Sequence, residues 1–599
     1  MSQILPPATK WLRSIGQVLA IAFLLAACGG GGGGDSGSPA DDPGPTPSVS
    51  VSPASADVDV GDDLVLEATV TGAGGGALAW EVEGVEGGDA DVGWISAAGV
   101  YTPPEAVDAP RTFVVTVRLE DDPQVSADAT VRAHPRFSDR TLRGSYVFLF
   151  TEALDSGEYA RVGGVFEADG SGRLNGTVDI ASTVGVAEGL PMEGTYAVNE
   201  DGEGVATIRV DGDIAYEVRV LARNRDQGAV EGATVGERIS GRYVRRTEPD
   251  TVVGPGEGAF TFSYSGLELS GMRWTSSIGR IAISSSGQVL SGDQDLYTTD
   301  TADTGVQITG GNLDVSGADG RGTATVWNQY GPTRLRVYMV DDDSFHFLGV
   351  DGDELFSGIA YRLPSGEVSA MTLEGAYMMG LSSRTGIYLS RFTLDGGGNV
   401  LDARVDRHAG SFVEEDQPLA GTYTLNPNAR GILSVDSVPL TRELVLRLVN
   451  PNFGWLGATA QEPADSGVIR HHLPDVAYAD TLGSYEGPIS VFSWDGAAPA
   501  PTNFSGMSRW EFSDSGNVEL YLIGYEWQSD VNVPVDYFFT GTASIGEDGC
   551  AMLVIDGLGD RLRACFGSTD NGSTQGVDRA LLLSLDDVRL VSGTLFRRY

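Results

Sequence analysis

The sequence predicts an all-β protein built from one β-sandwich followed by four tandem antiparallel up-and-down β-barrels. Apolar and polar residues alternate with period two, and no stretch after residue 30 has the 3.6-residue period of a long amphipathic helix. Glycine supplies 82 of the 599 residues, about twice its usual share of ~7%. Glycine-rich turn signals recur at intervals of about ten residues, as short strands joined by tight turns require.

Internal repeats carry the barrel prediction. Three motifs recur four times in the same order. Their first members read "FEADGSGRL", "GTYAVNEDGEGVATI" and "SGRYVRR". The turn glycines of the first motif are 115, 111 and 118 residues apart, at Gly172, Gly287, Gly398 and Gly516. We therefore predict four copies of one module, spanning 138–248, 255–365, 371–474 and 483–599.

The first copy contains eight runs with strand character, at 142–150, 159–168, 173–182, 190–198, 204–211, 214–223, 227–236 and 239–246. Eight antiparallel strands with short connections can close on themselves, which removes the exposed sheet edges. The alternative is an eight-bladed β-propeller with four strands in each blade. A blade repeat spans about 40–50 residues, whereas the visible unit is about twice as long, so separate barrels are favoured.

The ends of the first copy, "GSYVFLF" and "GRYVRR", faintly resemble the lipocalin-like barrels called calycins. In that family a first-strand Gly-x-Trp meets a last-strand arginine. Tyr146 stands in place of the tryptophan, and Arg242 or Arg245 would be the basic partner. The resemblance spans a few residues and implies a barrel, without implying a lipocalin-type ligand pocket.

Residues 49–134 form a separate unit with short alternating strands and a central "ALAWEVEG". The unit resembles a bacterial immunoglobulin-like domain, although it lacks a cysteine pair. In such a sandwich Val58, Val60, Leu64 and Leu66 would face one core around Trp80. The resemblance implies a spacer or adhesive module.

The N-terminus predicts export. Lys10 and Arg13 precede the apolar run "IGQVLAIAFLLAA", and no acidic residue occurs before Asp35, so 1–27 is expected to be a signal peptide. Leu25-Ala26-Ala27-Cys28 resembles a bacterial lipobox, which implies that Cys28 becomes the lipidated first residue of the mature chain. The Gly- and Pro-rich segment 28–48 would then be a flexible tether. Because Gly29 is not an aspartate, the resemblance implies an outer-membrane lipoprotein, on the periplasmic or the cell-surface side.

The charge restricts the partners. The chain has 39 Lys and Arg against 83 Asp and Glu, a net charge of −44, and removal of Lys10 and Arg13 with the signal peptide makes it −46. Such a charge repels phosphate backbones, which excludes nucleic acid. The expected partners are the membrane, through the lipid anchor, and envelope proteins or glycans. The oligomeric state stays open.

Two cysteines remain after Cys28, and they flank "AMLVIDGLGDRLRA". In a simple hairpin register Cys550 lies directly across from Cys565, close enough for a disulfide. Export to an oxidising compartment favours that bond over two reduced core cysteines.

Other chemistry-bearing residues form no recognisable constellation. The five histidines show no metal-ligand spacing and are expected at surfaces or strand edges. The acidic stretch 341–354 lacks calcium-loop spacing, so no cofactor is predicted beyond weak divalent-cation binding. Core packing is expected for Trp274, Trp327, Trp455, Trp494, Trp510 and Trp527 rather than a sugar-binding face.

No catalytic residue is predicted, because the mature chain contains no G-x-S-x-G, P-loop, dinucleotide or zincin motif. These observations favour a lipid-anchored envelope protein with a binding, adhesive or structural role. The rival hypothesis is an envelope hydrolase or glycan-processing enzyme with unrecognised carboxylates. A function private to one copy is most expected in the divergent fourth copy.

Overall fold

A computed structural model describes residues 46–597 except 73–76, 105–106, 108–109, 155–156, 235–236, 248–256, 299, 316, 352, 365–372, 384–385, 410–411, 437–440, 458–465, 473–482, 494–502, 514, 529–530, 547, 549, 557–559, 568–578 and 586–588. The predicted signal peptide 1–27, Cys28 and nearly all of the tether lie outside the described residues.

The N-terminal unit is a β-sandwich of short strands. A five-stranded sheet has the order β2-β11-β10-β5-β6, a four-stranded sheet has the order β3-β9-β8-β7, and β1 pairs with β4. Trp80, Val58 and Leu66 are buried in its core as predicted, whereas Leu64 is only partly buried. The strands are β1 (Ser48–Ser52), β2 (Ser55–Asp59), β3 (Leu64–Val65), β4 (Glu67–Thr71), β5 (Leu78–Val82), β6 (Val85–Glu86), β7 (Gly88–Asp89), β8 (Gly93–Ile95), β9 (Val100–Thr102), β10 (Arg111–Leu119) and β11 (Ser126–His134).

Four closed barrels follow, each made of eight consecutive strands. A short 3-10 helix (Asp139–Thr141) leads into barrel 1. Barrel 1 contains β12 (Arg143–Leu154), β13 (Tyr159–Asp169), β14 (Arg173–Ser182), β15 (Gly185–Val198), β16 (Glu203–Val210), β17 (Asp213–Ala222), β18 (Gln227–Gly232) and β19 (Glu237–Arg245). Barrel 2 contains β20 (Gly258–Glu268), β21 (Arg273–Ile283), β22 (Gln288–Thr298), β23 (Ala302–Asp314), β24 (Arg321–Asn328), β25 (Gly331–Met339), β26 (Ser344–Gly349) and β27 (Glu354–Arg362).

Barrels 3 and 4 repeat this topology. Barrel 3 contains β28 (Glu374–Ser383), β29 (Gly386–Asp395), β30 (Asn399–Ala409), β31 (Phe412–Leu425), β32 (Arg430–Asp436), β33 (Thr441–Asn450), β34 (Phe453–Gly457) and β35 (Ser466–His471). Barrel 4 contains β36 (Gly483–Ser493), β37 (Asn503–Phe512), β38 (Asn517–Gln528), β39 (Val531–Ile545), β40 (Cys550–Ile555), β41 (Asp560–Gly567), β42 (Arg579–Ser584) and β43 (Arg589–Arg597).

In every repeat the first strand pairs with the last, for example β12 with β19 and β36 with β43. This pairing closes each repeat on itself and leaves no open edge. The prediction of tandem eight-stranded barrels is confirmed, and the propeller alternative is not supported.

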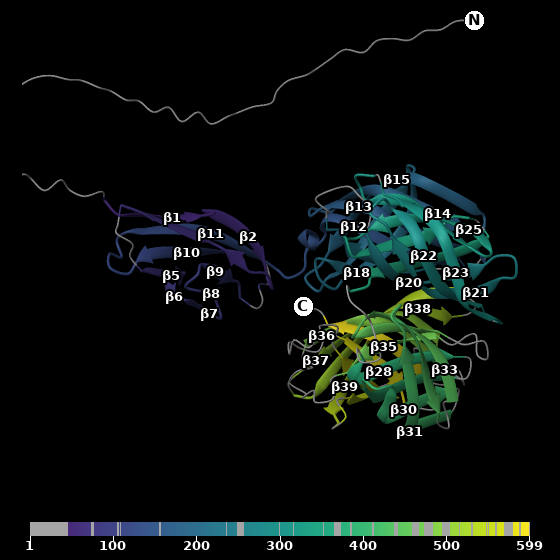
Figure 1. Cartoon of the computed structure of the whole chain (residues 1–599). Helices are drawn as coiled ribbons and strands as arrows, with labels where there is room; N and C mark the ends of the chain where they lie inside the picture. The colour runs from purple at the N-terminus through teal and green to yellow at the C-terminus, as the bar shows by residue number, and fades with distance from the viewer. Residues whose placement is uncertain are drawn as a thin grey trace, which may run out of the picture.

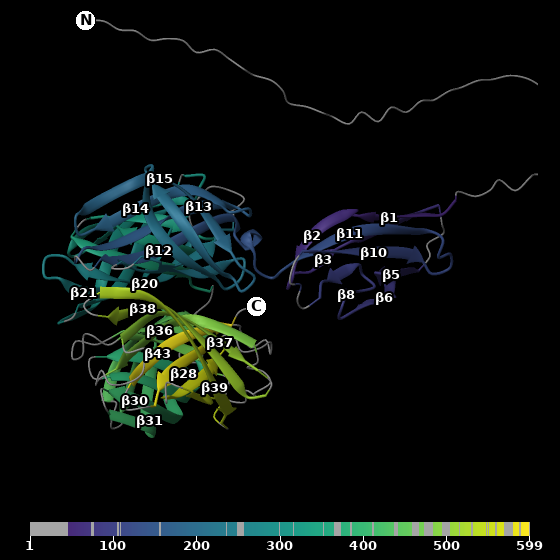
Figure 2. The same ribbon diagram turned by 180° about the vertical axis from the view of Figure 1, so that it is seen from behind.

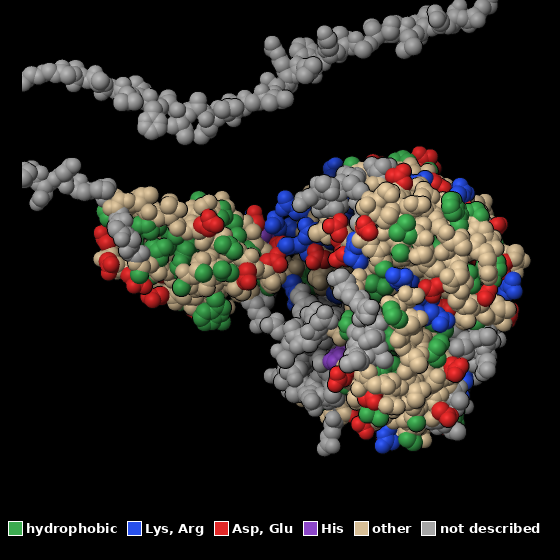
Figure 3. Space-filling model, in the orientation of Figure 1, with side chains coloured by type: hydrophobic (Ala, Val, Ile, Leu, Met, Phe, Trp, Pro, Cys, Tyr) green, Lys and Arg blue, Asp and Glu red, His purple; other side chains and the backbone are tan. Residues whose placement is uncertain are grey.

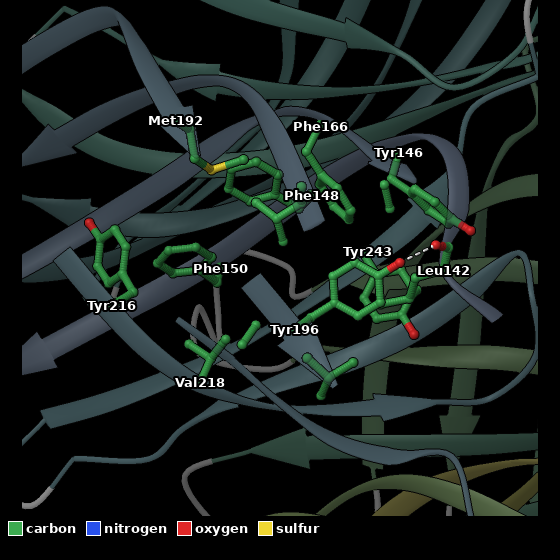
Figure 4. Close-up of a cluster of buried hydrophobic side chains, with 14 of the residues drawn as sticks. Leu142, Tyr146, Phe148, Phe150, Phe166, Met192, Tyr196, Tyr216, Val218 and Tyr243 are labelled. Atoms are coloured by element: carbon green, nitrogen blue, oxygen red, sulfur yellow. Dashed lines mark hydrogen bonds between the residues drawn. The ribbon is translucent and has the colours of Figure 1, made fainter. Parts of the chain in front are cut away.

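Barrel 1 shows how the strand pattern builds the interior. Tyr146, Phe148 and Phe150 alternate along β12 and point into a core that Phe166, Met192 and Tyr243 complete (Figure 4). The intervening Val147 and Leu149 point outward, yet they too are buried, because they pack against barrel 2. Both faces of β12 are therefore apolar, as in strands that are buried on two sides.

The four barrels form a closed ring. Barrels 1 and 2 lie in one layer and barrels 3 and 4 in the other, as both views show (Figures 1 and 2). Barrel 1 contacts barrel 2 through β13 with β26 and β27, and barrel 2 contacts barrel 3 through β20 with β33 and β21 with β34. Barrel 3 contacts barrel 4 through β29 and β30 with β42, and β37 of barrel 4 returns to β18 of barrel 1.

The sandwich is docked on barrel 1 by ion pairs. Arg225 of barrel 1 donates to Asp59 at 2.6 Å and also to Asp62, and Arg140 donates to Asp59 at 3.4 Å. Arginine and acidic side chains accordingly gather where the sandwich meets the ring (Figure 3). These pairs are partly exposed, so their contribution to stability is modest.

Candidate functional site: the second barrel and the interfaces of the ring

Barrel 2 encloses a cavity of about 490 Å³, whereas the cavity in barrel 1 measures about 50 Å³. Two turns lie at the mouth. One, at Tyr330 and Gly331, is between β24 and β25, and the other, which includes Asp351 and Asp353, is between β26 and β27. Aromatic side chains line its wall, namely Phe262, Tyr264, Phe345, Phe347 and Phe356. An eight-stranded barrel is wide enough either to be filled by side chains or to hold one small ligand, and barrel 2 leaves room for the ligand.

One substitution between the copies opens the mouth of barrel 2. In barrel 1, Tyr216 pairs with Ile208, and its ring packs edge-on against Phe150 with centroids 5.1 Å apart. Ile208 is the sixth residue of strand five in barrel 1, and Val326 is the sixth residue of strand five in barrel 2. Val326 pairs with Thr333, so Thr333 occupies the place of Tyr216. The tyrosine plug of barrel 1 is thus a threonine in barrel 2 (Figure 4 shows Tyr216 beside Phe150).

The mouth of the cavity is acidic. Glu268 and Glu354 are directly opposite each other in the pairing of β20 with β27 and so share the inner face. Glu268 accepts from Arg273 Nε at 3.0 Å, and Asp351, which lines the cavity, accepts from Arg334 Nε at 2.7 Å. Glu354 lines the cavity without a hydrogen bond or an ion pair to any residue in the described part of the chain.

The environment of Glu354 opposes its ionisation. Burial raises the pKa of the Glu354 carboxyl, and the like charges of Glu268 and Asp353 raise it further. Burial also raises the pKa of Tyr264, and the nearby Glu354 raises it again. Ser277, opposite Tyr264 on the same face, is fully buried beside the tyrosine, and its hydroxyl acts in the other direction by lowering the pKa of Tyr264. The cavity therefore presents the carboxyl of Glu354 beside aromatic walls.

A second set of charged residues holds the ring together, beginning between barrels 1 and 2. Asp179 on β14 is fully buried. Its carboxylate accepts from Arg321 Nε at 2.7 Å and from the Tyr338 hydroxyl at 2.8 Å, both in barrel 2. The backbone N–H of Gly189 donates to the same carboxylate at 2.8 Å. Charge-assisted bonds from several directions offset the cost of burying a charge.

The same arrangement recurs between barrels 2 and 3. Asp295 on β22 is fully buried and accepts from Arg430 Nη2 and Arg447 Nη2 of barrel 3, both at 2.9 Å. The backbone N–H of Gly305 donates to it at 2.9 Å. Burial acts to raise the pKa of the Asp295 carboxyl, but the two arginines outweigh it, so the pKa lies below its usual range.

Between barrels 3 and 4 the buried aspartate is Asp406 on β30. It accepts from Arg563 Nη1 of barrel 4 at 3.1 Å, from Arg391 Nη1 of its own barrel at 3.3 Å and from the Asp416 backbone N–H at 2.8 Å. In all three clusters the donating backbone N–H lies ten residues after the aspartate. Strand three of one barrel thus meets the next barrel head to tail, which is a heterologous interface repeated three times.

Cys550 and Cys565 occupy the corresponding place in barrel 4. Cys550 is the first residue of strand five and pairs with Cys565 on strand six. At the same position barrel 3 pairs Arg430 with Arg447. The two sulfurs are joined in a disulfide, and both side chains are buried against Met378 and Leu389 of barrel 3. The cysteine pair, like the arginines, therefore belongs to an interface between barrels.

The interface that closes the ring is different. Strand three of barrel 4 has Gly524 where the other copies have the aspartate, and Pro534, ten residues later, has no N–H to donate. Barrel 4 instead contacts barrel 1 through Arg509 Nη1, which donates to Glu203 at 2.8 Å. Glu231, on the outer face of β18, is also buried, its carboxyl accepts from Ser240 of the same barrel, and burial raises its pKa to about 8.

The structure also tests the predicted basic partner of Tyr146 and the predicted burial of the tryptophans. Arg245 lies opposite Tyr146, whereas Arg242 lies opposite Leu149 on the outer face, so Arg245 is the basic partner of the tyrosine. Trp510 and Trp455 are buried, but Trp274 and Trp327 are at least half exposed, contrary to the core-packing prediction. The side chains of Trp494 and Trp527 lie outside the described residues.

The prediction for the histidines is wrong. Four of the five are buried, namely His134, His346, His408 and His472. For His346, His408 and His472 the reason is that outward-facing positions become internal where barrels meet, whereas His134 ends β11 of the sandwich and pairs with Asp57. His472, at the end of barrel 3, bonds through its ring nitrogens to the backbone oxygens of Phe566 and Asp548 in barrel 4. The described residues contain no group of three or more His, Cys, Asp or Glu side chains that could hold a metal ion.

Sequence reasoning missed the interface aspartates and Thr333. A signal for the aspartates was present, because they follow the turn glycines Gly172, Gly287 and Gly398 by seven, eight and eight residues. The acidic stretch 341–354 was noticed, and its end supplies the mouth of the cavity. Nothing in one sequence marks Thr333, because its meaning depends on the strand that it pairs with.

Comparisons with known proteins add little. No family model matches the chain, and no curated protein matches it. Among solved structures, the alcaligin outer membrane receptor FauA from Bordetella pertussis aligns over 81% of both chains with 10% identity and a TM-score of 0.11. A score this low supports no inference about fold or function. Among the helices of the described chain, none is long and apolar enough to span a membrane.

Proposed function

We propose that this chain is an envelope binding protein that holds a small ligand inside its second barrel, displayed on a four-barrel ring. The observation that carries the proposal is the cavity of about 490 Å³, which lies within the range of about 300–1,000 Å³ typical of ligand pockets. Its wall is mostly aromatic, with a few polar groups at the mouth, and this composition is also typical of such pockets.

The ring serves this role as a rigid support. Three buried aspartate clusters and their surrounding apolar contacts fix each barrel against the next. A binding site held by locked side chains on packed strands is better organised than one on loops. The cavity needs no contribution from the other barrels, so the ring acts by holding barrel 2 and its mouth turns in place.

The remaining parts of the chain would place the ring at the cell envelope. In this proposal Cys28 is lipidated, the Gly- and Pro-rich segment is the tether, and the N-terminal sandwich is an immunoglobulin-like spacer docked on barrel 1 through Arg225. The net charge of −46 in the mature chain would keep the ring away from anionic headgroups.

A cavity-filling substitution tests the binding role. The probe is N-phenyl-1-naphthylamine, a neutral apolar dye whose fluorescence increases in dry surroundings, titrated with the full mature chain. Thr333→Tyr restores the plug of barrel 1 and is expected to abolish saturable binding. The matched control is Thr323→Tyr, at an exposed position on the outer face of β24, which should bind as the wild type does. Equal binding by wild type and Thr333→Tyr would contradict the proposal.

The anchor is tested separately. Cys28→Ser is expected to move the protein from the membrane fraction to the soluble envelope fraction, because the lipid chains supply about 0.8 kcal/mol for each buried CH₂. Membrane partitioning that is the same for the variant and the wild type would refute lipidation at this residue.

A further inference from the structure

We propose that the ligand of the second barrel is an organic cation, an ammonium group on an apolar body, with its charge at Glu354. This inference rests on the proposed binding role of barrel 2 and names the chemical class that its mouth would select.

The first argument is the charge at the mouth. Of the acids there, Glu268 and Asp351 each have an arginine partner, whereas Glu354 and Asp353 have none among the described residues; Asp353 is exposed in the turn, and Glu354 lies on the strand and faces inward. Glu354 also faces Glu268 directly across the strand pair, an arrangement of like charges that destabilises a sheet. A ligand cation would pair with Glu354 and remove this repulsion. An anion such as a fatty acid would add to it.

The second argument is the wall next to that charge. Phe356 follows Glu354 by two residues on the same strand, so both side chains face the cavity. The rings of Phe356 and Tyr264 lie 4.4 Å apart, and Tyr264 stacks on Phe262 with an angle of 2° between the ring planes. Aromatic faces beside a carboxylate attract a cation through their quadrupoles while they accommodate its apolar body.

Three naphthalene probes separate charge from size. They are 1-naphthylmethylamine (protonated at neutral pH), 1-naphthalenemethanol and 1-naphthoate, titrated against the full mature chain at fixed ionic strength. We expect the cation to bind about tenfold more tightly than the neutral alcohol, which is the size expected for a hydrogen bond to a charged group, and the anion to bind most weakly.

Glu354→Gln is expected to abolish the preference for the cation while the alcohol still binds. The matched control, Glu167→Gln on the exposed outer face of barrel 1, changes the net charge equally and should keep the preference. Because the pKa of Glu354 is raised by burial and by Glu268 and Asp353, the wild-type preference should also decrease as the pH is lowered toward 5.

The two proposals fail differently. If the alcohol binds and Thr333→Tyr blocks it, but the cation has no advantage, the cation inference is wrong and the binding role stands. If no probe binds in a way that depends on residue 333, the binding role is wrong as well. A preference for the cation that survives in Glu354→Gln would refute the assignment to this carboxylate.

Discussion

The interface between barrels 2 and 3 and the interface between barrels 4 and 1 both join neighbouring barrels of the ring, but through different residues. The first buries Asp295 between two arginines of the next barrel, and Arg447 is itself fully buried. The second joins Arg509 to Glu203, which is one-third exposed. Glu231, buried on β18 of barrel 1, accepts from Ser240, and no arginine among the described residues bonds to it. Interfaces between neighbours in sequence are thus built around a buried ion cluster, whereas the described residues of the closing interface form no such cluster.

The difference shows how tethering shapes an interface. Two barrels joined by a short linker meet at a high effective concentration, so a geometrically demanding cluster can form reliably. Barrels 1 and 4 lie at opposite ends of the array, so no short linker brings them together. We infer that the closing interface is the weakest joint of the ring.

The largest effect is expected from Asp295→Asn. The substitution leaves Arg430 and Arg447 facing a neutral amide in a buried site, which is expected to cost about 3–5 kcal/mol. Urea unfolding followed by tryptophan fluorescence would measure the loss. An equal loss in Glu203→Gln would show that the two interfaces do not differ as described.

Reduction of the disulfide comes next. Cys550 and Cys565 are 15 residues apart, and closing a loop of that length in the unfolded chain is worth about 3 kcal/mol. We expect dithiothreitol, or the double variant Cys550→Ser with Cys565→Ser, to destabilise barrel 4 by that order. Because the pair packs against barrel 3, hydrogen exchange should increase in β29 as well as in β40. Faster exchange confined to barrel 4 would argue against an interface role.

A pH-dependent effect of about 2 kcal/mol between pH 6 and 8 is expected from Glu231. In the unfolded chain this glutamate ionises above about 4.5, whereas the folded carboxyl keeps its proton until its pKa of about 8. Between these two pKa values the carboxyl ionises in the unfolded chain but not in the folded one. The free energy of unfolding therefore decreases as the pH rises across that window. Thermal unfolding of wild type and Glu231→Gln should diverge with pH, and parallel pH profiles would contradict the assignment.

The smallest effect is expected from Glu203→Gln. An ion pair with this exposure is worth about 1 kcal/mol or less, and its contribution falls with added salt. Hydrogen exchange should report local opening of β18 and β37 without global unfolding. A double-mutant cycle with Arg509→Ala would isolate the pair from the stacking of Arg509 on Tyr521. A coupling energy near that of the buried clusters would mean that the joint is not weak.

The sequence predicts the architecture better than the site. Alternating strands and repeated turn glycines are local signals, and they correctly indicate eight-stranded modules. The fate of outward-facing residues cannot be predicted that way, because Val147 or His346 is exposed in a lone barrel and buried in a ring. Alternation along a strand likewise does not say which of its two faces is the inner one, so Trp274 and Trp327 were expected in a core although they are exposed.

The cavity in barrel 2 could not be predicted from the sequence alone. Its volume depends on which side chains meet across β24 and β25, so Thr333 matters only in comparison with Tyr216 of barrel 1. Strand pairing supplies that comparison, and a linear reading of one copy does not. The acids of 341–354 were visible, but the neutralisation of Asp351 by Arg334 and the isolation of Glu354 are properties of the folded mouth.

The altered ends of the array have a consequence for solubility. A head-to-tail contact that is repeated three times within one chain is, in principle, open to a second molecule, and open-ended contacts of that kind produce filaments. Such growth would need an aspartate on strand three of barrel 4 to meet donors on barrel 1 of the next copy. The chain has Gly524 at the first place, and barrel 1 has the acidic Glu203 where barrels 2 and 3 have Arg321 and Arg430, so both terminal barrels depart from the residues that make this contact. The departures in the first and last repeats thereby act as caps against polymerisation.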